Sequence, residues 1–180
     1  MGEAHTDIKE TITPYLSAEK IAARVAEIAA EIDRDFAGKH VTLLGTLRGA
    51  IMFLADLARA ITLPVTLEFI KVSSYGGQSE SNGEVQLDFP FQMDLKGQNV
   101  IIVEDIVDMG YTARWLREYL QSFDPADLRL CTLLDKPDRR KVPVKIDYMG
   151  FSIPDEFVVG YGLDFAQRHR NLPYVGILKG

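Results

Sequence analysis

The chain has 180 residues, of which 47% are hydrophobic, and a formal net charge of −6 at pH 7. That length and apolar content predict one domain, over residues 1–180, with a sizeable core. The acidic balance argues against nucleic acid and anionic membranes as partners, so any anionic ligand must be met by local positive groups.

Strands alternate with helices along the chain. Ser17 can cap a helix whose apolar residues recur at helical spacing and which Gly38 ends. The remaining predicted elements are a strand at 41–45, a helix at 51–61, strands at 65–72 and 99–103, a helix at 112–123, a strand at 128–134, and short apolar pieces near residue 148, at 157–159 and at 174–178. This alternation predicts an α/β fold with a central, mostly parallel twisted sheet flanked by helices.

The compartment is indicated by the single cysteine, Cys131. One cysteine excludes an internal disulfide and is typical of a reducing cytoplasm. Its apolar neighbours favour an inert strand residue. The polar stretch from Met1 to Thr11 has no signal-peptide pattern, and no apolar run approaches the ~18–20 residues that span a bilayer. We therefore expect a cytoplasmic protein with no membrane partner.

Ligands of parallel sheets bind outside the carboxyl ends of the strands. This rule predicts one crevice formed by residues 45–49, residues 104–112 and Lys136. Residues 74–84, SYGGQSESNGE, contain three glycines and no large aliphatic residue. Two interpretations remain open for this segment: a hairpin loop, or a flexible lid that closes over the crevice and excludes water.

The most informative segment is VIIVEDIVDMGYTARWL, residues 100–116. Four apolar residues lead into Glu104 and Asp105, and a loop with Asp108 and Gly110 precedes a helical pattern. Free N–H groups and the helix dipole at such a helix start favour a phosphate. Acids beside a phosphate usually bind sugar hydroxyls or a metal. An ordinary strand-to-helix turn would also contain Asp and Gly, but the preceding acids favour a sugar-phosphate site.

This segment resembles the phosphoribosyl-pyrophosphate signature of the type I phosphoribosyltransferases. Three further segments, GTLRGA (45–50), LLDKP (133–137) and IPDEFVVGYGLDFAQRHRNLP (153–173), are similar to the hypoxanthine-guanine branch of that family, in its bacterial form. The similarity extends from about Ser17 to the C-terminus. The resemblance implies the type I phosphoribosyltransferase fold, with a small hood formed by the chain termini and a lid loop.

The resemblance also implies an activity. A 6-oxopurine displaces pyrophosphate from phosphoribosyl pyrophosphate in a Mg²⁺-dependent reaction of purine salvage, and the enzyme is a homodimer or homotetramer. Its substrates are small molecules. Mg²⁺ suits such a site because it prefers a few oxygen ligands together with water and substrate phosphates.

The family pattern assigns roles to individual residues. It gives phosphoribosyl binding to Glu104, Asp105, Asp108, Met109, Gly110, Tyr111 and Thr112; pyrophosphate contacts to Leu47, Arg48, Gly49 and Arg170; purine contacts to Lys136, Phe157, Val158 and Asp164; a metal to Glu104, Asp105 and Asp164; and the lid to Ser74 and Tyr75. In relatives the peptide that matches Leu47–Arg48 is often cis.

Within this pattern Asp108 is the implied general base that takes the N7 proton of the purine. Lys136 is the implied donor to O6, which disfavours adenine because its 6-amino group is itself a donor. Phe157 would stack on the ring. The residues alone leave other interpretations open: a helix cap for Asp108, a core side chain for Phe157, and a solvated helix end for Arg170.

The chain departs from many relatives at Met109 and Tyr111, where backbone donors would persist but side-chain contributions would change. Three alternatives concern the activity. A xanthine- or guanine-preferring phosphoribosyltransferase differs in contacts to position 2 of the ring. A phosphoribosyltransferase-like regulator that binds RNA, or a non-catalytic nucleotide-binding module, would keep part of the site. The acidic charge argues against the RNA-binding regulator.

Overall fold

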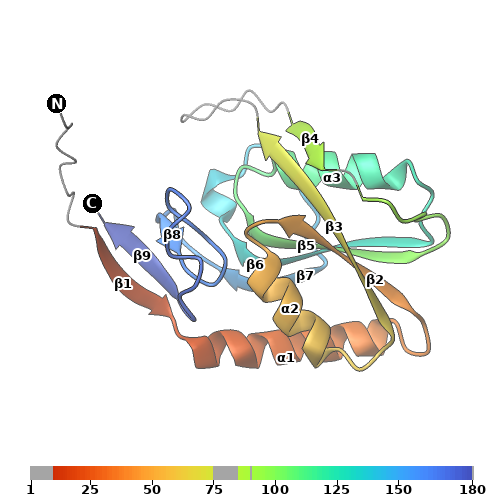
Figure 1. Ribbon diagram of the computed structural model, residues 1–180, viewed down its shortest axis with the longest axis horizontal. Helices are drawn as coiled ribbons and strands as arrows, with labels where there is room; N and C mark the ends of the chain where they lie inside the picture. The colour runs from red at the N-terminus through yellow and green to blue at the C-terminus, as the bar shows by residue number, and fades with distance from the viewer. Residues whose placement is uncertain (1–9, 75–84, 90, 180) are drawn as a thin grey trace, which may run out of the picture.

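The structure, a computed structural model, describes residues 10–74, 85–89 and 91–179. Its main sheet has six strands in the order β4-β3-β2-β5-β6-β7, and every pairing is parallel except that of β3 with β4 (Figure 1). The strands are β2 (Val41–Leu47), β3 (Val65–Ser74), β4 (Val85–Phe89), β5 (Asn99–Val107), β6 (Asp127–Asp135) and β7 (Tyr148–Ser152). This arrangement confirms the predicted α/β fold.

Helices cover both faces of the main sheet. α1 (Ala18–Asp35) and α2 (Ile51–Ala60) pack on one face, and α3 (Tyr111–Gln121) packs on the other. The Ser17 hydroxyl accepts a hydrogen bond from the Lys20 N–H (3.3 Å) and caps α1, as predicted. None of the helices in the described ranges is long and apolar enough to cross a membrane.

β5 separates the two cores. Ile101 and Val103 belong to the core beneath α1 and α2, whereas Val100 and Ile102 belong to the core beneath α3. All four side chains are fully buried, as expected for a parallel strand between two helical layers. Because successive side chains of a strand point to opposite faces, β5 delivers one acid to each side of the sheet at its carboxyl end.

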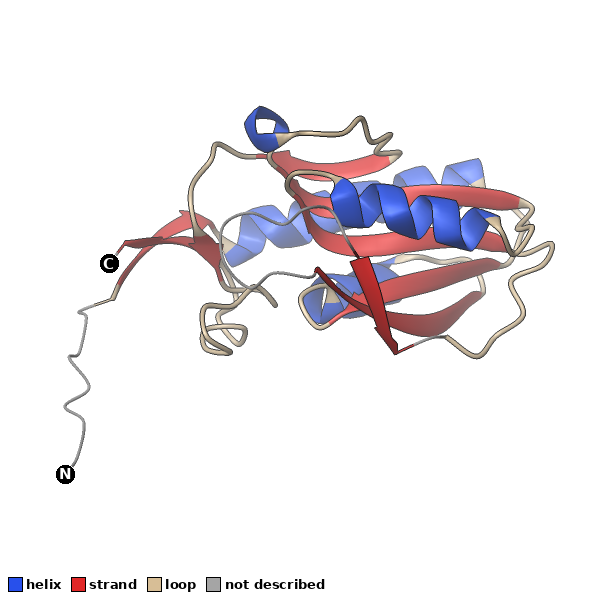
Figure 2. Ribbon diagram, turned by 90° about the horizontal axis from the view of Figure 1, so that it is seen from above, coloured by secondary structure: helices blue, strands red, loops and turns tan. Residues whose placement is uncertain are grey.

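The two ends of the described chain meet in a second, smaller sheet. β1 (Thr11–Leu16), β9 (Val175–Lys179) and β8 (Val158–Val159) pair antiparallel in the order β1-β9-β8. Figure 2 shows this sheet projecting from one end of the molecule. It is the hood that the family resemblance implied. The Leu178 N–H also donates to the Phe157 carbonyl (2.9 Å), which anchors the residue that precedes β8.

The structure corrects the sequence prediction in three places. β5 continues to Val107, four residues beyond the predicted end, because it stays paired with β6 as far as Asp135. β1 and β4 were not predicted. The proposed lid at 74–84 falls largely outside the described residues: Ser74 ends β3 without a described side chain, and Tyr75 is not described.

Candidate active site

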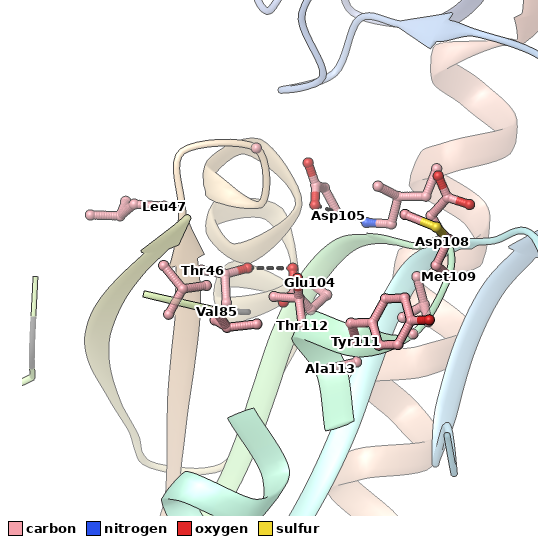
Figure 3. A pocket seen from close by; sticks show the side chains of 15 residues that line it. Thr46, Leu47, Val85, Glu104, Asp105, Asp108, Met109, Tyr111, Thr112 and Ala113 are labelled. Atoms are coloured by element: carbon pink, nitrogen blue, oxygen red, sulfur yellow. Dashed lines mark hydrogen bonds between the residues drawn. The ribbon is translucent and has the colours of Figure 1, made fainter. Parts of the chain in front are cut away.

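A cavity of about 300 Å³ opens at the carboxyl ends of β2 and β5 (Figure 3). Its lining combines the end of β2, the acids of β5 and the start of α3: Thr46, Leu47, Gly49, Val72, Val85, Glu104, Asp105, Ile106, Val107, Asp108, Met109, Gly110, Tyr111, Thr112 and Ala113. A larger cavity of about 450 Å³ lies between α1, α2 and residues 170–173, but the β5 acids do not line it. The first cavity is therefore the candidate site.

The two acids at the end of β5 point in different directions. Glu104 lies on the α3 side, where the Thr46 hydroxyl donates to its Oε2 (2.6 Å). Asp105 lies on the α1–α2 side and accepts the Ile106 N–H at Oδ1 (2.9 Å). The sequence prediction that the strand ends before these acids is wrong, and regular strand geometry explains why they diverge.

Glu104 is almost fully buried, and its Oε1 has no hydrogen-bond partner within the described ranges. Burial and the neighbouring Asp105 raise the pKa of Glu104 to about 8. A buried carboxylate with an orphaned oxygen is costly unless a proton or a cation compensates its charge. Glu104 can therefore bind a cation or accept a hydrogen bond from a hydroxyl group that enters the cavity.

Asp105 is held beneath the loop that follows β2. A Cβ atom added to Gly49 would lie only 1.6 Å from the Asp105 Oδ2, so only glycine permits this approach. Burial raises the pKa of Asp105 to about 6; the Ile106 N–H and the positive charge of Arg170 act in the opposite direction, and Asp164 acts with burial. The charges of Asp164 and Arg170, both in the loop after β8, therefore act on the Asp105 carboxyl in opposite directions.

The loop from β5 to α3 presents backbone donors. Gly110 is the N-cap of α3 with φ +94°, and no side chain caps the helix. Residues of the first turn of α3, among them Thr112, line the cavity (Figure 3), and the first N–H groups of this helix have no side-chain acceptor among the described residues. Asp108 does not cap α3, which removes the capping interpretation of that residue.

Two arginines from distant segments converge on one glutamine. The Gln167 Oε1 accepts hydrogen bonds from Arg48 Nη1 (3.1 Å) and from Arg170 Nη2 (3.2 Å). Arg170 also forms an ion pair with Asp164 (2.7 Å), and the peptide between Leu47 and Arg48 is cis. The structure thus brings Arg48, Asp164 and Arg170 together.

The loop after β8 lies directly against the loop after β2. A Cβ atom on Gly162 would lie 2.0 Å from the Gly49 carbonyl oxygen, so the two backbones touch. Near them, Ala166, Gln167 and His169 have positive φ values of 50°, 65° and 77°. Such backbone conformations cost of order 1 kcal/mol each in non-glycine residues and often accompany function.

The implied purine residues come from two places, the turn after β6 and the segment around β8. Lys136 follows β6 and is buried, with its Nζ 4.0 Å from the Asp155 Oδ1. The Phe157 ring is 52% exposed and packs edge-on against Phe165 (5.7 Å between centroids), so the core interpretation of Phe157 is wrong and a face remains available for stacking. Val158 is buried in β8.

No group of three or more acids, histidines or cysteines is arranged as a preformed metal cluster among the described residues. Glu104, Asp105 and Asp164 therefore do not form such a cluster. The site still suits Mg²⁺, because that ion is commonly held by one or two carboxylates together with substrate phosphates and water. Two oxygen donors fit this ion. One is the Glu104 Oε1, which has no hydrogen-bond partner among the described residues, and the other is the Asp105 carboxylate, which has a further acid, Asp164, near it.

No individual role was predicted for four residues that contact predicted site residues: Thr46, Arg139, Asp155 and Gln167. Thr46, Asp155 and Gln167 lie inside segments that carried the resemblance, so proximity to those motifs was a usable signal for these residues. Gln167 contacts Arg48 across 119 sequence positions, and Arg139 contacts Asp108 from another strand end. Sequence spacing contains no signal for these two contacts.

Comparisons with known proteins agree with this geometry. Residues 12–166 match the family described as "Phosphoribosyl transferase domain". The chain is 47% identical to a hypoxanthine phosphoribosyltransferase of Haemophilus influenzae over 98% of this chain and 97% of that protein. It is 46% identical to a hypoxanthine-guanine phosphoribosyltransferase of Mycobacterium tuberculosis, over 96% and 87% of the two chains. A solved hypoxanthine-guanine phosphoribosyltransferase of Bacillus anthracis superposes with a TM-score of 0.90 at 42% identity, over 96% and 100% of the chains.

Proposed function

This chain belongs to the phosphoribosyltransferase family, and from that premise we propose that it is a purine-salvage enzyme that joins hypoxanthine, and also guanine, to phosphoribosyl pyrophosphate. The products are the nucleoside monophosphate and pyrophosphate. The observation that carries the proposal is the convergence of three features at one sheet edge: the uncapped start of α3, the paired arginines and the buried lysine after β6.

In the proposed reaction, purine N9 forms a bond to C1 of the ribose while the bond from C1 to the pyrophosphate oxygen breaks. The electron pair of that bond leaves with pyrophosphate, and the N7 proton passes to Asp108. The α3 start binds the 5′-phosphate. Arg48 and Arg170 stabilise the charge that develops on the leaving group.

We propose that Mg²⁺ supports this reaction by neutralising the phosphate oxygens of the substrate. Glu104 and Asp105 would hold the ion or the ribose hydroxyls, because their buried carboxylates need a compensating charge. Asp164 is already paired with Arg170. Its share in binding the ion would therefore depend on the arginine moving to pyrophosphate.

Purine choice would depend on the buried Lys136, whose ammonium group donates to O6 of a 6-oxopurine. Adenine presents a donor at that position, so the lysine would face an amino group and lose its acceptor. Val158 and Asp164 are the candidates for contacts near position 2, where hypoxanthine, guanine and xanthine differ.

We further propose a cytoplasmic enzyme, acting as a single domain on small molecules without a nucleic-acid partner. The lone, buried Cys131 supports a reducing compartment, since burial raises its pKa and leaves the thiol inert. Exposed apolar side chains on α2 and β3, such as Ile51 and Leu67, support association into a homodimer or homotetramer. Light scattering on the purified protein distinguishes these states.

The activity is tested by incubating purified protein with phosphoribosyl pyrophosphate, Mg²⁺ and each of hypoxanthine, guanine, xanthine and adenine. We expect nucleotide formation with hypoxanthine and guanine, little with adenine, and loss of turnover when Mg²⁺ is chelated. A preference for xanthine would favour the alternative specificity. Absence of turnover with every 6-oxopurine would refute the proposed function.

A further inference from the structure

Arg139 contacts two carboxylates that belong to separate segments of the site. It lies on η1 (Pro137–Arg139), the short 3₁₀ turn after β6. Its Nε is 2.9 Å from the Asp108 Oδ1, and its Nη1 donates to the Asp155 Oδ1 at 3.2 Å. The proposed reaction does not use this side chain directly, although it contacts the proposed base, Asp108.

The contact leaves one oxygen of Asp108 available. Its Oδ1 is buried beneath Arg139, in a close ion pair whose N–H is not aligned as a hydrogen bond. The Asp108 side chain as a whole is nevertheless about one-third exposed (35%). Oδ2 is therefore the oxygen that a purine can reach, and the position of Arg139 determines the direction in which it points.

The neighbouring Arg140 fixes the backbone of the same residue. Its Nε donates to the Asp108 carbonyl (2.9 Å), and its guanidinium is also paired with Asp135. The two arginines thus divide the contacts: Arg140 holds the main chain of the loop and Arg139 holds only the carboxylate. Changing Arg139 should leave the phosphate-binding backbone in place.

Asp155 links this pair to the oxopurine donor. Its Oδ1 lies between Arg139 (3.2 Å) and the Lys136 Nζ (4.0 Å). Charges of alternating sign therefore run from Asp108 through Arg139 and Asp155 to Lys136. In the proposed reaction the two ends of this row meet two atoms on the same edge of the purine, N7 and O6.

We propose that Arg139 is a positioning residue for the proton-transfer step. It binds one oxygen of Asp108 so that the other faces purine N7, and Asp155 holds Arg139 in register with Lys136. This inference rests on the proposed function. A base must lie within hydrogen-bond reach of the proton that it takes, and a small misplacement costs rate rather than substrate affinity. The ion pairs are partly exposed and contribute little to stability, so the variants should fold.

The test compares R139Q with R139K and with the matched control K141Q, which removes one positive charge from an exposed lysine two residues away. Single-turnover rates and KM values are measured with hypoxanthine and with 8-azahypoxanthine, whose ring N–H is more acidic. We expect R139Q to lower the rate with hypoxanthine about tenfold, with little change in KM for phosphoribosyl pyrophosphate. The loss should shrink with 8-azahypoxanthine, R139K should recover part of the rate, and K141Q should stay within about twofold.

Three results would overturn the inference. Equal losses with both purines would mean a structural role, and thermal unfolding of R139Q would then show the damage. A faster rate or a lower purine KM would mean that Arg139 competes with the purine for Asp108. An unchanged rate would mean that the contact has no role in turnover. If the unaltered protein forms no nucleotide at all, the proposed function fails first and the inference falls with it.

Discussion

The two halves of the site are built in different ways. The phosphate-binding half, residues 104–112, is one continuous segment whose geometry follows from the end of β5, Gly110 and the start of α3. The half that would hold pyrophosphate and purine combines short segments after β2, β6, β7 and β8. They are held by ion pairs between side chains that are partly exposed, apart from the buried Lys136. We therefore expect the first half to be rigid before substrate arrives, and the second half to consist of contacts that substrate replaces.

The largest effect is expected at Asp108, where the two halves meet. D108N removes the proposed base but keeps the size of the side chain, so turnover should fall by roughly 10²-fold or more. Steady-state and single-turnover rates with hypoxanthine measure it. D138N, which makes the same charge change at an exposed residue of η1, should keep nearly full turnover. Full activity of D108N would mean that Asp108 is not the base and serves only as an ion-pair partner of Arg139.

Rigidity of the phosphate-binding half is tested at Gly110. Its φ is +94°, and an added Cβ would lie 2.8 Å from Arg140 Cδ and 2.9 Å from the Val142 carbonyl oxygen. G110A should therefore lower the free energy of unfolding by about 2–4 kcal/mol, from backbone strain and overpacking together. Denaturant titration measures this change. We also expect G110A to bind phosphoribosyl pyrophosphate more weakly, as measured by calorimetric titration.

G97A supplies the matched control for that experiment. Gly97 also has a positive φ (+69°), but no atom of the described residues lies within 4 Å of its added Cβ. It should show only the strain, about 1–2 kcal/mol. If both variants lost the same stability, close packing around Gly110 would not contribute.

The same contrast explains what could be predicted from sequence. Glu104 to Thr112 were identified because a strand, a glycine turn and a helix start are local patterns. Gln167 and Arg139 were missed because their partners, Arg48 and Asp108, lie on other segments of the chain. β1 was missed because Pro14 interrupts its pattern and its partner β9 lies at the other end of the chain. The end of β5 was misjudged because acids were taken as a stop, whereas pairing with β6 continues the strand.

Charge in the rigid half makes the ligand-free protein sensitive to pH. Burial raises the pKa of Glu104 from 4.5 to about 8 and that of Asp105 from 3.8 to about 6. A carboxyl whose folded pKa is raised stabilises the fold fully below its unfolded pKa, and this contribution is lost as pH rises through the folded pKa. The free energy of unfolding should therefore fall by several kcal/mol as the pH rises from 5 to 8, with Glu104 contributing the larger share.

E104Q isolates the contribution of Glu104 to that slope. The variant should flatten the pH dependence and be more stable than the unaltered protein at pH 8, as measured by urea denaturation without ligand. Adding Mg²⁺ with phosphoribosyl pyrophosphate should stabilise the unaltered protein more than E104Q at that pH. A slope that is the same in both proteins would mean that Glu104 does not titrate in this range.

The smallest effect is expected in the adjustable half, at Gln167. Its amide oxygen is a neutral acceptor for Arg48 and Arg170, so it holds two like charges together without adding a negative charge that would compete with pyrophosphate. Q167N, whose shorter amide still tolerates the positive φ, should weaken pyrophosphate binding about threefold to tenfold, as removal of one such contact implies. Q167E should retain the arginine geometry but bind pyrophosphate less well, because its carboxylate must be displaced. Calorimetric titration with Mg²⁺-pyrophosphate separates these outcomes. Tighter binding by Q167E would mean that preorganisation of the two arginines outweighs the competition between its carboxylate and pyrophosphate. The pyrophosphate-binding half would then be preformed, like the phosphate-binding half.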